Sequence, residues 1–571
     1  MHIHVVPNRG SRPAVLLRES YREGKKVKKR TLANLSSLPM QKVELIRRVL
    51  NGDPLAPVES LFDITASLLH GHVEAVLTAM RRLGVAALLS SRPCRERDLV
   101  IGMVASRILD PQSKLATTRW WHTTTLPGEL GVADATEEDL YSAMDWLLER
   151  QPRIEKALAT RHLEQGGMVL YDLSSSYFEG SACPLAALGY SRDGRKGKLQ
   201  VNYGLVTDKR GCPVAVSVHP GNTNDAKTLL PQVQTLRETF GIKDLVLVGD
   251  RVMIGQKQID EIKKIENAEW ITALKTGAMR QLLEAGHLQM GLFDERNLFE
   301  MTVPECPGER LVACRNPPLA HLRAAKRKSL LDATARALDQ VRAMVARGRS
   351  RGLRTKDEIG VRVGKVIDKY KVAKHFRLVI DEGRFEFSVD EEKVAAEAVL
   401  DGVYVVRTSL QEARMSAEHT VRSYKLLSGV ERAFRSIKTI DLKVRPIYHH
   451  LEDRVRAHIF LCMLAYYVEW HILEAWRELL FSDEDAQAKL SRDPVAPARR
   501  SRDALRKVQA RVLDDGTPVH GFQTLLAELT TIVRNTCRRK GADVDEPVFS
   551  VTTTPTAKQQ RALDLAAAIH L

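Results

Sequence analysis

The sequence predicts an α/β core with a mixed sheet, interrupted by a long insertion and placed between a mostly helical N-terminal region and a helical C-terminal region. Three observations predict it. The hydrophobic pattern changes from helical spacing to short apolar runs at Gly166, a hairpin pattern follows over 199–219, and a wholly apolar run ends at Asp250. Such a run is typical of a central strand buried on both faces, so helices are expected to cover the sheet.

Breaks in composition and pattern divide the 571 residues into six expected parts. They are a small β-rich basic segment (1–57), a helical region (58–165), the first part of the core (166–276), a long intervening segment named the insertion (277–400), the second part of the core (401–480) and a helical C-terminal region (481–571). Prolines in 54–57 indicate a linker after the first segment.

The charge balance points to a polyanionic partner. The chain has 87 Lys and Arg against 71 Asp and Glu, a net charge of +16. No apolar run approaches the ~18 residues that span a bilayer, and the N-terminus has no signal-peptide pattern. We therefore expect a cytoplasmic protein with no membrane partner.

Seven cysteines are scattered without a C-x-x-C pair, and the histidine pairs lack partners at ligand spacing. This pattern fits neither a disulfide framework nor a zinc site, and it predicts reduced, mostly buried thiols.

Two features before Gly166 are candidates for DNA binding. Strands are expected over 14–39 around a turn at 23–25, and the run 25–30 is either a solvated strand face or a phosphate contact. Two helices, 99–109 and 114–121, flank a break at 110–113; they form either a DNA-reading helix-turn-helix or an ordinary helix pair.

Two aspartates end the strand patterns of the core. Asp172 lies near the end of the run 167–173, and Asp250 ends the run 244–250. Because ligand sites gather at the carboxyl ends of strands, the two side chains are expected to converge; the alternative is that each is a turn residue. Between them, Asn224 or Asp225 is suited to cap a helix that reaches about residue 240.

A third acid, Glu431, lies on a predicted helix. With about 100° per residue, one stripe holds Tyr424, Leu427, Glu431, Arg435 and Lys438. A surface ion pair between Glu431 and Arg435 is the structural alternative.

The insertion and the tail carry further basic charge. The part 311–349 reads as a basic helix and 376–389 as strands, while Trp270 is either a base-stacking or a core residue. The bases expected to be available to phosphate are Arg323, Lys326, Arg327, Lys328, Arg347, Arg349 and Arg351. The tail after Ser482 holds basic clusters at 499–502 and 538–540 among helical segments, and self-association is one use for it.

Taken together, these motifs resemble the DDE transposases of bacterial insertion sequences over roughly 14–480. The segments that carry the resemblance are YDLSSSYFEG (171–180), YSRDG (190–194), GNTND (221–225), DRVM (250–253), DGVY (401–404), VERAFR (430–435) and RPIYH (445–449). The resemblance implies an RNase H-like catalytic core with a five-stranded mixed sheet, and it identifies the insertion (277–400) as a domain that splits this core.

It also implies a subgroup with a helix signature of Tyr, Arg, Glu and Lys. Tyr424, Glu431 and Lys438 match the signature in spacing, but Leu427 stands where Arg is usual, and Arg435 could supply the missing guanidinium. Val252 replaces the usual Gly after Asp-Arg, a change that we interpret as harmless.

By this resemblance, Asp172, Asp250 and Glu431 are the catalytic metal ligands. They would hold two Mg²⁺ ions, for which Mn²⁺ substitutes, with Asp172 touching both, because in-line displacement at phosphorus uses two metal ions and Mg²⁺ prefers oxygen ligands. The residues implied to bind DNA are Tyr424, Arg435, Lys438 and Arg251.

The implied partners are DNA at the terminal inverted repeats and at the target, and a second copy of the chain, in a nucleoid-associated complex. End-specific binding is expected before Gly166. Two alternatives stay open: an RNase H-like nuclease or recombinase that cuts without joining, and a catalytically inactive DNA-binding derivative. The intact acid triad argues against the inactive derivative.

Overall fold

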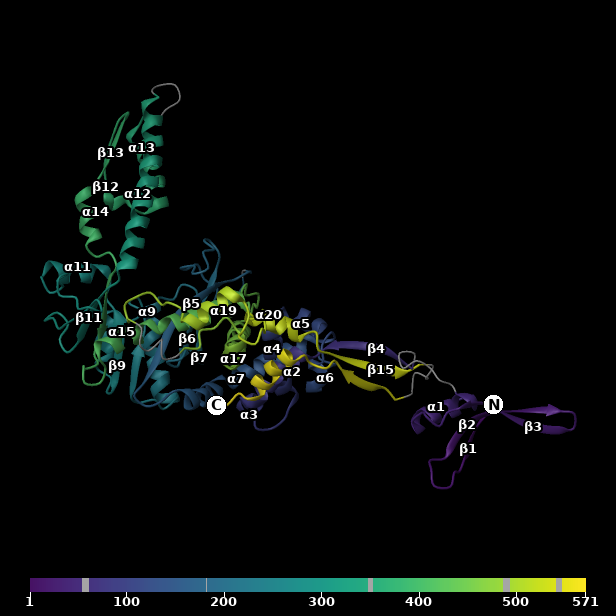
Figure 1. The fold of residues 1–571 in the computed structure, drawn as a ribbon. Helices are drawn as coiled ribbons and strands as arrows, with labels where there is room; N and C mark the ends of the chain where they lie inside the picture. Colours follow the sequence, from purple (N-terminus) through teal and green to yellow (C-terminus); the bar gives the residue numbers. More distant parts are fainter. Residues whose placement is uncertain (54–60, 181, 348–352, 486–492, 541–546) are drawn as a thin grey trace. The chain divides into compact units, whose positions relative to one another are not determined.

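The structure is a computed structural model, and it describes residues 1–53, 61–180, 182–347, 353–485, 493–540 and 547–571 (Figure 1). The chain forms two compact units, the first from 1–68 and 533–553 and the second from 69–532 and 554–571. The expected linker at 54–57, Arg349 and Arg351 lie outside the described residues.

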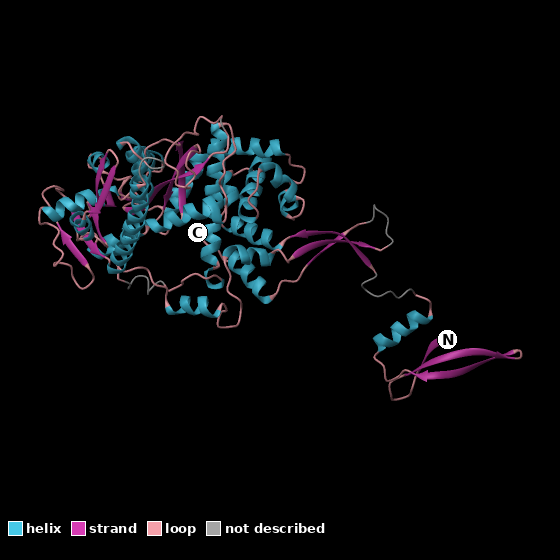
Figure 2. Cartoon of the chain, turned by 90° about the horizontal axis from the view of Figure 1, so that it is seen from above, coloured by secondary structure: helices cyan, strands magenta, loops and turns pink. Residues whose placement is uncertain are grey.

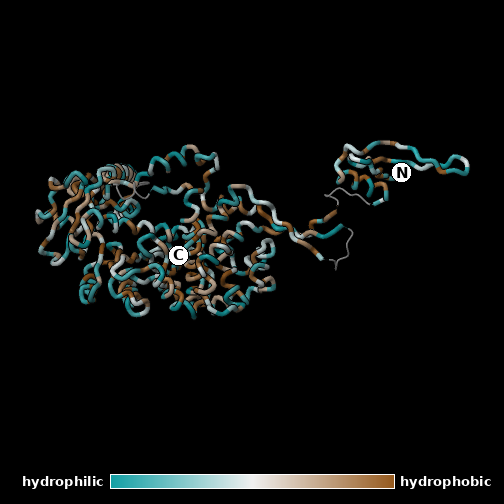
Figure 3. Tube along the Cα trace, turned by 60° about the horizontal axis from the view of Figure 1, so that its bottom comes forward, coloured by the Kyte–Doolittle hydropathy of each residue, from teal (hydrophilic) through white to brown (hydrophobic). Residues whose placement is uncertain are grey.

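The first unit contains two three-stranded sheets. One holds β1 (His2–Val6), β2 (Ala14–Glu23) and β3 (Lys26–Asn34), followed by α1 (Met40–Leu50). Gly24, with φ 62°, makes the turn between β2 and β3, as expected. Figure 3 shows that the tip of this hairpin is hydrophilic. Within the basic run, Lys28 and Arg30 pair with Glu23 and Glu19, so part of its charge is compensated inside the sheet.

The other sheet of the first unit is a departure from the expected helical regions. It joins β4 (Phe62–Leu69) to β15 (Val533–Arg539) and β16 (Phe549–Thr552), strands from opposite ends of the chain. The rings of Phe62 and Phe549 meet edge to face at 4.9 Å. A pairing across so many residues leaves no local pattern, which is why both regions were expected to be helical throughout.

The second unit begins with the expected helices. They are α2 (Gly71–Arg82), α3 (Val85–Leu89), α4 (Arg95–Leu109), α5 (Lys114–Trp121), α6 (Leu126–Leu130), α7 (Glu137–Glu149) and α8 (Gln151–His162). Trp121 Nε1 donates to Ser106 Oγ at 2.6 Å and ties α5 to α4. Helices α4 and α7 pack against α17 (Glu452–Ala475), whose residues from Ala457 to Ile472 are buried. Figure 3 shows hydrophobic segments gathered in this interior.

A mixed sheet of eight strands follows, with helices around it (Figure 2). Its order is β10 (Leu298–Met301), β11 (Arg310–Arg315), β14 (Val403–Thr408), β9 (Ala268–Ala273), β8 (Leu245–Val248), β5 (Gly167–Tyr177), β6 (Gln200–Thr207) and β7 (Pro213–Pro220). Strands β5, β8 and β9 are parallel, and the other neighbouring pairs are antiparallel.

The sheet is larger than the five strands expected, because β14, β11 and β10 extend it beyond β9. Two of these strands come from the expected insertion. Residues 311–315 are therefore a strand and not the start of a helix, and their apolar side chains are buried in the sheet. Trp270 is 3% exposed in β9, so it is a core residue.

The rest of the insertion has its own core. Helix α12 (Pro317–Ala346) lies beside α13 (Lys356–Tyr370), and the expected strand region is the hairpin of β12 (Phe376–Asp381) and β13 (Arg384–Val389), followed by α14 (Glu391–Ala398) (Figure 1). Arg327 forms an ion pair with Asp401. The expected bases that remain exposed here are Arg323, Lys326, Lys328 and Arg347.

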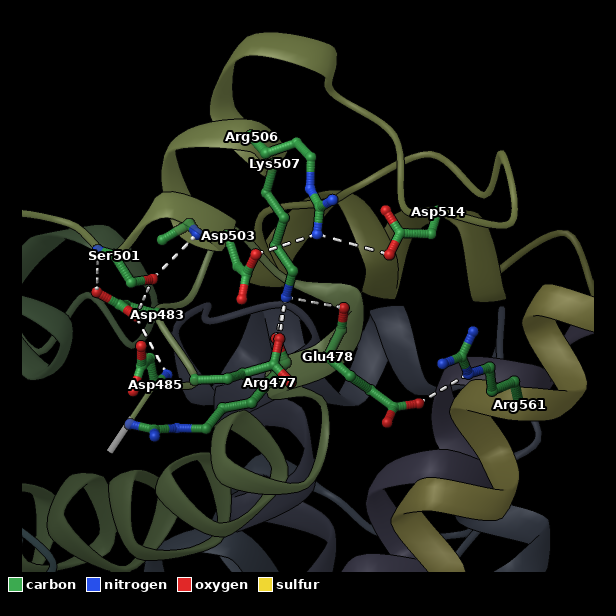
Figure 4. Close-up of polar contacts among 12 residues, drawn as sticks. Arg477, Glu478, Asp483, Asp485, Ser501, Asp503, Arg506, Lys507, Asp514 and Arg561 are labelled. Carbon is green, nitrogen blue, oxygen red and sulfur yellow. Dashed lines mark hydrogen bonds and ion pairs between the residues drawn. The ribbon is translucent and has the colours of Figure 1, made fainter. Parts of the chain in front are cut away.

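The C-terminal region packs on the end of α17. Its helices are α19 (Arg502–Ala510), α20 (Phe522–Leu529) and α21 (Ala557–Ala567). Figure 4 shows Lys507 Nζ donating to the carbonyls of Arg477 and Glu478, at 3.5 and 3.2 Å, and Arg561 pairing with the Glu478 side chain at 2.7 Å. No helix in the described part of the chain is long and apolar enough to cross a membrane.

Candidate active site

Neighbouring parallel strands bring the first two acids together. In the register of β5 and β8, Leu170 lies opposite Val248, and Asp172 and Asp250 each follow two residues later. The two aspartates therefore leave the paired region at the same edge, where sites in α/β sheets form. Strand β5 continues to Tyr177 beside β6, so Asp172 lies in the middle of its strand and not near its end.

Helix α16 (Leu427–Arg435) packs against β5 and adds the third acid, Glu431. A cavity of about 440 Å³ is lined by all three acids, and Arg435 and Lys438 from the expected stripe line it too. Its other lining residues are Leu173, Ser174, Arg192, Asp193, Asp225, Phe434, Thr439 and Arg445.

The acids are close enough to affect one another. Burial raises the pKa of Asp172 to about 7, and the charges of Asp250 and Glu431 raise it further, while the hydrogen bond from Leu173 N, at 2.8 Å, and the charge of Arg192 oppose this shift. The cavity thus holds carboxylates whose mutual repulsion is only partly compensated by the protein.

Asp250 is a turn residue as well as a member of this cluster. Its Oδ1 accepts hydrogen bonds from the backbone N–H groups of Val252 and Met253, both at 2.9 Å. Its Oδ2 has no hydrogen bond within the described residues. One oxygen therefore holds the turn, and the other is available to a ligand.

Glu431 does not form the surface ion pair that was the alternative for it. Glu431 and Arg435 are both exposed, and across the described ranges neither side chain has an ion-pair partner. The carboxylate of Glu431 is therefore available at the cavity.

The expected single helical stripe is divided. Helix α15 (Ala417–Lys425) ends before α16 begins, and the π-helix η4 (Ser436–Ile440) follows α16. Tyr424 lies on α15 and does not line the cavity, although burial, followed by the charge of Asp250, raises its pKa to about 12. Leu427 is 9% exposed and packs in the core, a place that suits Leu better than the usual Arg.

Lys438, which the resemblance implies to bind DNA, lines the cavity but is buried. It lies in the π-helix, its Nζ is 2.6 Å from Asp193 Oδ1, and it donates to Ser174 Oγ at 3.1 Å. Burial lowers the pKa of Lys438, and Asp193 opposes that shift. Arg435, in contrast, is exposed at the cavity, whereas Arg251 is exposed on the turn after Asp250 and does not line the cavity.

Sequence reasoning assigned no role to the ion pairs beside the acids. Asp193 pairs with Arg445 as well as Lys438, and its Oδ2 accepts a hydrogen bond from Tyr177 N at 3.0 Å. Arg192 pairs with Asp225 at 2.5 Å, and Asn224 caps α9 (Asp225–Gln234) as expected. The signal was present, since these residues belong to the motifs at 190–194, 221–225 and 445–449.

Sequence spacing also missed a group of metal-ligand types, His162, Cys212 and His471, whose ligand atoms lie within 4.8 Å of one another. The two nitrogens of His162 already contact Tyr467 Oη, at 3.1 Å, and the guanidinium of Arg210, at 3.2 Å. Burial raises the pKa of the Cys212 thiol well above its usual range. A neutral thiol beside a guanidinium favours a hydrogen-bonded polar cluster over a cation site.

Comparison with known families decides what this site belongs to. Residues 184–468 match the family model of the transposase DDE domain, and residues 3–55 match that of the N-terminal domain of IS1634 family transposases. The chain belongs to the DDE transposases of insertion sequences. It is thus a transposase, an enzyme that cleaves and joins DNA. Asp250 and Glu431 lie inside the matched DDE region, and Asp172 lies twelve residues before it.

Two further comparisons add little to this assignment. No curated protein sequence matches the chain significantly. Among solved structures, a piggyBac transposase synaptic complex with hairpin DNA is 8% identical, with a TM-score of 0.34, over 78% of this chain and 87% of that one.

Proposed function

We propose that Asp172, Asp250 and Glu431 are the catalytic acids of this transposase, holding two Mg²⁺ ions, or Mn²⁺ in their place, for cleavage of the insertion-sequence ends and strand transfer into target DNA. The observation that carries the proposal is that these three acids line one cavity, where burial, and then the charges of Asp250 and Glu431, raise the pKa of Asp172.

The donor set fits two hard divalent cations. It consists of carboxylate oxygens, and Asp250 Oδ2 and Glu431 have no competing partner within the described residues. When bound, such ions supply activation of the attacking oxygen and stabilisation of the leaving one.

The basic residues of the cavity have separate tasks. Arg435, exposed at the cavity, binds a phosphate of the DNA strand near the acids. Lys438, held by Asp193, positions Ser174 and β5 and adds positive charge behind the acids. Tyr424 and Arg251 contact DNA beside the cavity, on α15 and on the turn after Asp250.

The architecture supports an RNase H-like core. Strands β7-β6-β5-β8-β9 are contiguous, with β5, β8 and β9 parallel and β6 and β7 antiparallel, which is the mixed five-stranded set expected for that fold. We infer that this core comprises 166–276 and 401–480, that 277–400 is an insertion domain, and that the chain belongs to the subgroup with the Tyr, Arg, Glu and Lys helix.

The proposed partners are DNA at the terminal inverted repeats and at the target, and a second copy of the chain on the DNA, in a nucleoid-associated complex. The exposed basic strand β3 and the helices before Gly166 supply surfaces for binding the ends.

Charge-neutral substitution of the acids tests the proposal. Asp172→Asn, Asp250→Asn and Glu431→Gln keep the side-chain shape and should each lower cleavage and joining of end DNA by orders of magnitude while end binding persists. Glu391→Gln, exposed at the start of α14, is the matched control for loss of one negative charge. Near-normal strand transfer in a folded variant of one acid would show that this acid is not catalytic. Cleavage without a joined product would support the nuclease alternative.

A further inference from the structure

A second cavity, of about 520 Å³, lies where the turn between α4 and α5 meets the segment after η4 and the start of α17. Its charged lining residues are all basic: Arg107, Lys114, Lys443, Arg445 and Arg454. Three histidines, His449, His450 and His458, line it as well, and no carboxylate does so among the described residues. This concentration of one sign of charge is what an anion site requires.

Two of these cations are buried without a counter-charge. Lys114 is 4% exposed, and its Nζ has no hydrogen bond or ion pair in the part of the chain that the structure describes. Arg107 is 7% exposed and donates only to the backbone carbonyls of Gln112, at 3.2 Å, and Leu442, at 3.5 Å. A buried charge without a partner is unfavourable, so the empty arrangement carries a cost that an anion would remove.

Further nitrogen atoms around the cavity lack partners. Nε of Arg454 and Nδ1 of His458 are buried without a hydrogen bond. The guanidinium of Arg454 lies 3.6 Å from Asp145 and over the ring of Tyr141, 4.6 Å from its centroid, and Arg445 is paired with Asp193. These atoms add donors that a multivalent oxyanion accepts from.

The electrostatics of the cavity agree with this geometry. Burial and then the charge of Arg107 lower the pKa of Lys114 to about 7. Burial and then the charges of Lys114 and Arg107 lower the pKa of His449 to about 3. Cys462 opposes the shift of Lys114 only in part, and burial raises the pKa of its own thiol.

We propose that this cavity binds a phosphate group, with Arg107 and Lys114 as its buried ligands and Lys443 at its rim. A DNA strand or a soluble phosphate or pyrophosphate could supply that group. The DNA source is favoured because Arg445 lines both this cavity and the acid cavity, so a strand bound at the acids continues past Arg445. The phosphate site itself does not depend on the proposed function, but the choice of DNA as the source of the phosphate rests on it.

Two lysine variants separate this role from that of a buried neutral lysine. Lys114→Met removes a buried charge and keeps the length of the side chain, so it should fold at least as well as the natural protein. Lys443→Met changes an exposed side chain and cannot disturb the core. Lys365→Met, exposed on α13 and outside the cavity, is the matched control.

The first arm measures melting temperature with added pyrophosphate against sodium chloride of equal ionic strength. Pyrophosphate should raise the melting temperature of the natural protein and of Lys365→Met, but not that of Lys114→Met. The second arm measures binding of short duplex DNA in EDTA. Lys114→Met and Lys443→Met should each bind the duplex roughly ten times more weakly than the natural protein. The slope of log affinity against log salt concentration should fall by the equivalent of about one phosphate contact.

The arms distinguish the sources of the phosphate. Loss in both arms assigns the cavity to a DNA phosphate, and loss in the pyrophosphate arm alone assigns it to a soluble phosphate. If both lysine variants match the natural protein in both arms, the cavity is not a phosphate site. Because neither arm requires metal or turnover, failure of the proposed catalytic acids would not affect the result.

Discussion

Lys438 Nζ lies 2.6 Å from Oδ1 of Asp193, and the two side chains are only 10% and 1% exposed. The lysine expected to reach for DNA is therefore an internal cation, held by the segment between β5 and β6. Arg445 pairs with the same oxygen, so one carboxylate compensates two positive side chains beside the acid cavity.

Because Asp193 is shared, removing its charge should lower the free energy of unfolding more than removing the charge of Lys438. Asp193→Asn leaves both Lys438 and Arg445 without a counter-charge and should lower the free energy of unfolding by about 3 kcal/mol. Lys438→Met leaves Asp193 paired with Arg445 and should cost about 1 kcal/mol. The double variant should recover part of the Asp193→Asn loss. Urea denaturation measures all three, and equal costs for the single variants would contradict the shared arrangement.

Metal binding should depend on pH through Asp172. The pKa of Asp172 is raised to about 7 by burial and by the other acids, so below that pH a cation must displace its proton. Mn²⁺ affinity, measured by calorimetry, should rise about tenfold per pH unit from pH 5.5 to 7 and level off above it. In Asp172→Asn the slope should be much smaller. An affinity independent of pH in the natural protein would exclude Asp172 as a ligand.

End recognition should depend on the N-terminal segment. Residues 3–55 match a transposase N-terminal domain, and they carry the exposed basic strand β3. A deletion of residues 1–53 retains β4 and its partners β15 and β16, so the rest of the chain should fold. This deletion should bind DNA without preference for the element ends. Footprinting on end DNA and on scrambled DNA measures that preference, and equal protection of the ends by both proteins would place recognition elsewhere.

A truncation at Gly166, which the sequence pattern suggests, is a poorer test. Helices α4 and α7 pack against α17, so their removal exposes a helix that is buried from Ala457 to Ile472. Loss of binding would then report loss of folding and not loss of a DNA-binding surface.

The sequence predicted the parts of the site that local patterns encode. Asp172 and Asp250 end apolar strand patterns, and parallel strands bring such ends together, so their convergence followed from the pattern alone. The fate of Lys438 did not, because a uniform helical period ignores the break after Lys425 and the π-helix at 436–440. The extension of the sheet by β10 and β11 and the pairing of β4 with β15 were also missed. Long-range strand pairing has no signature within one segment, and the basic cavity at Lys114 likewise joins α5 to residues more than three hundred positions away.

The raised pKa of Asp172 also predicts that ionised Asp172 lowers the free energy of unfolding when no metal is bound. Its folded-state value is about 7 against an ordinary value of 3.8, so folding favours the protonated carboxyl. That contribution is fully present below about pH 3.8 and is lost as pH rises through 7, where the ionised side chain is held near Asp250 and Glu431. Asp172→Asn is neutral at every pH and keeps an oxygen to accept the hydrogen bond from Leu173 N. In EDTA at pH 8 it should be more stable than the natural protein by roughly 1 to 3 kcal/mol, and near pH 4 the difference should vanish.

Saturating Mg²⁺ should stabilise the natural protein and leave Asp172→Asn nearly unchanged. With Mg²⁺ at pH 8, the natural protein should therefore be the more stable of the two. Thermal melts at the two pH values, with and without Mg²⁺, measure both effects, with Arg323→Gln as a charge-change control remote from the acids. A variant that is no more stable than the natural protein in EDTA at pH 8 would show that burial and the neighbouring acids do not raise the pKa of Asp172 in the folded chain.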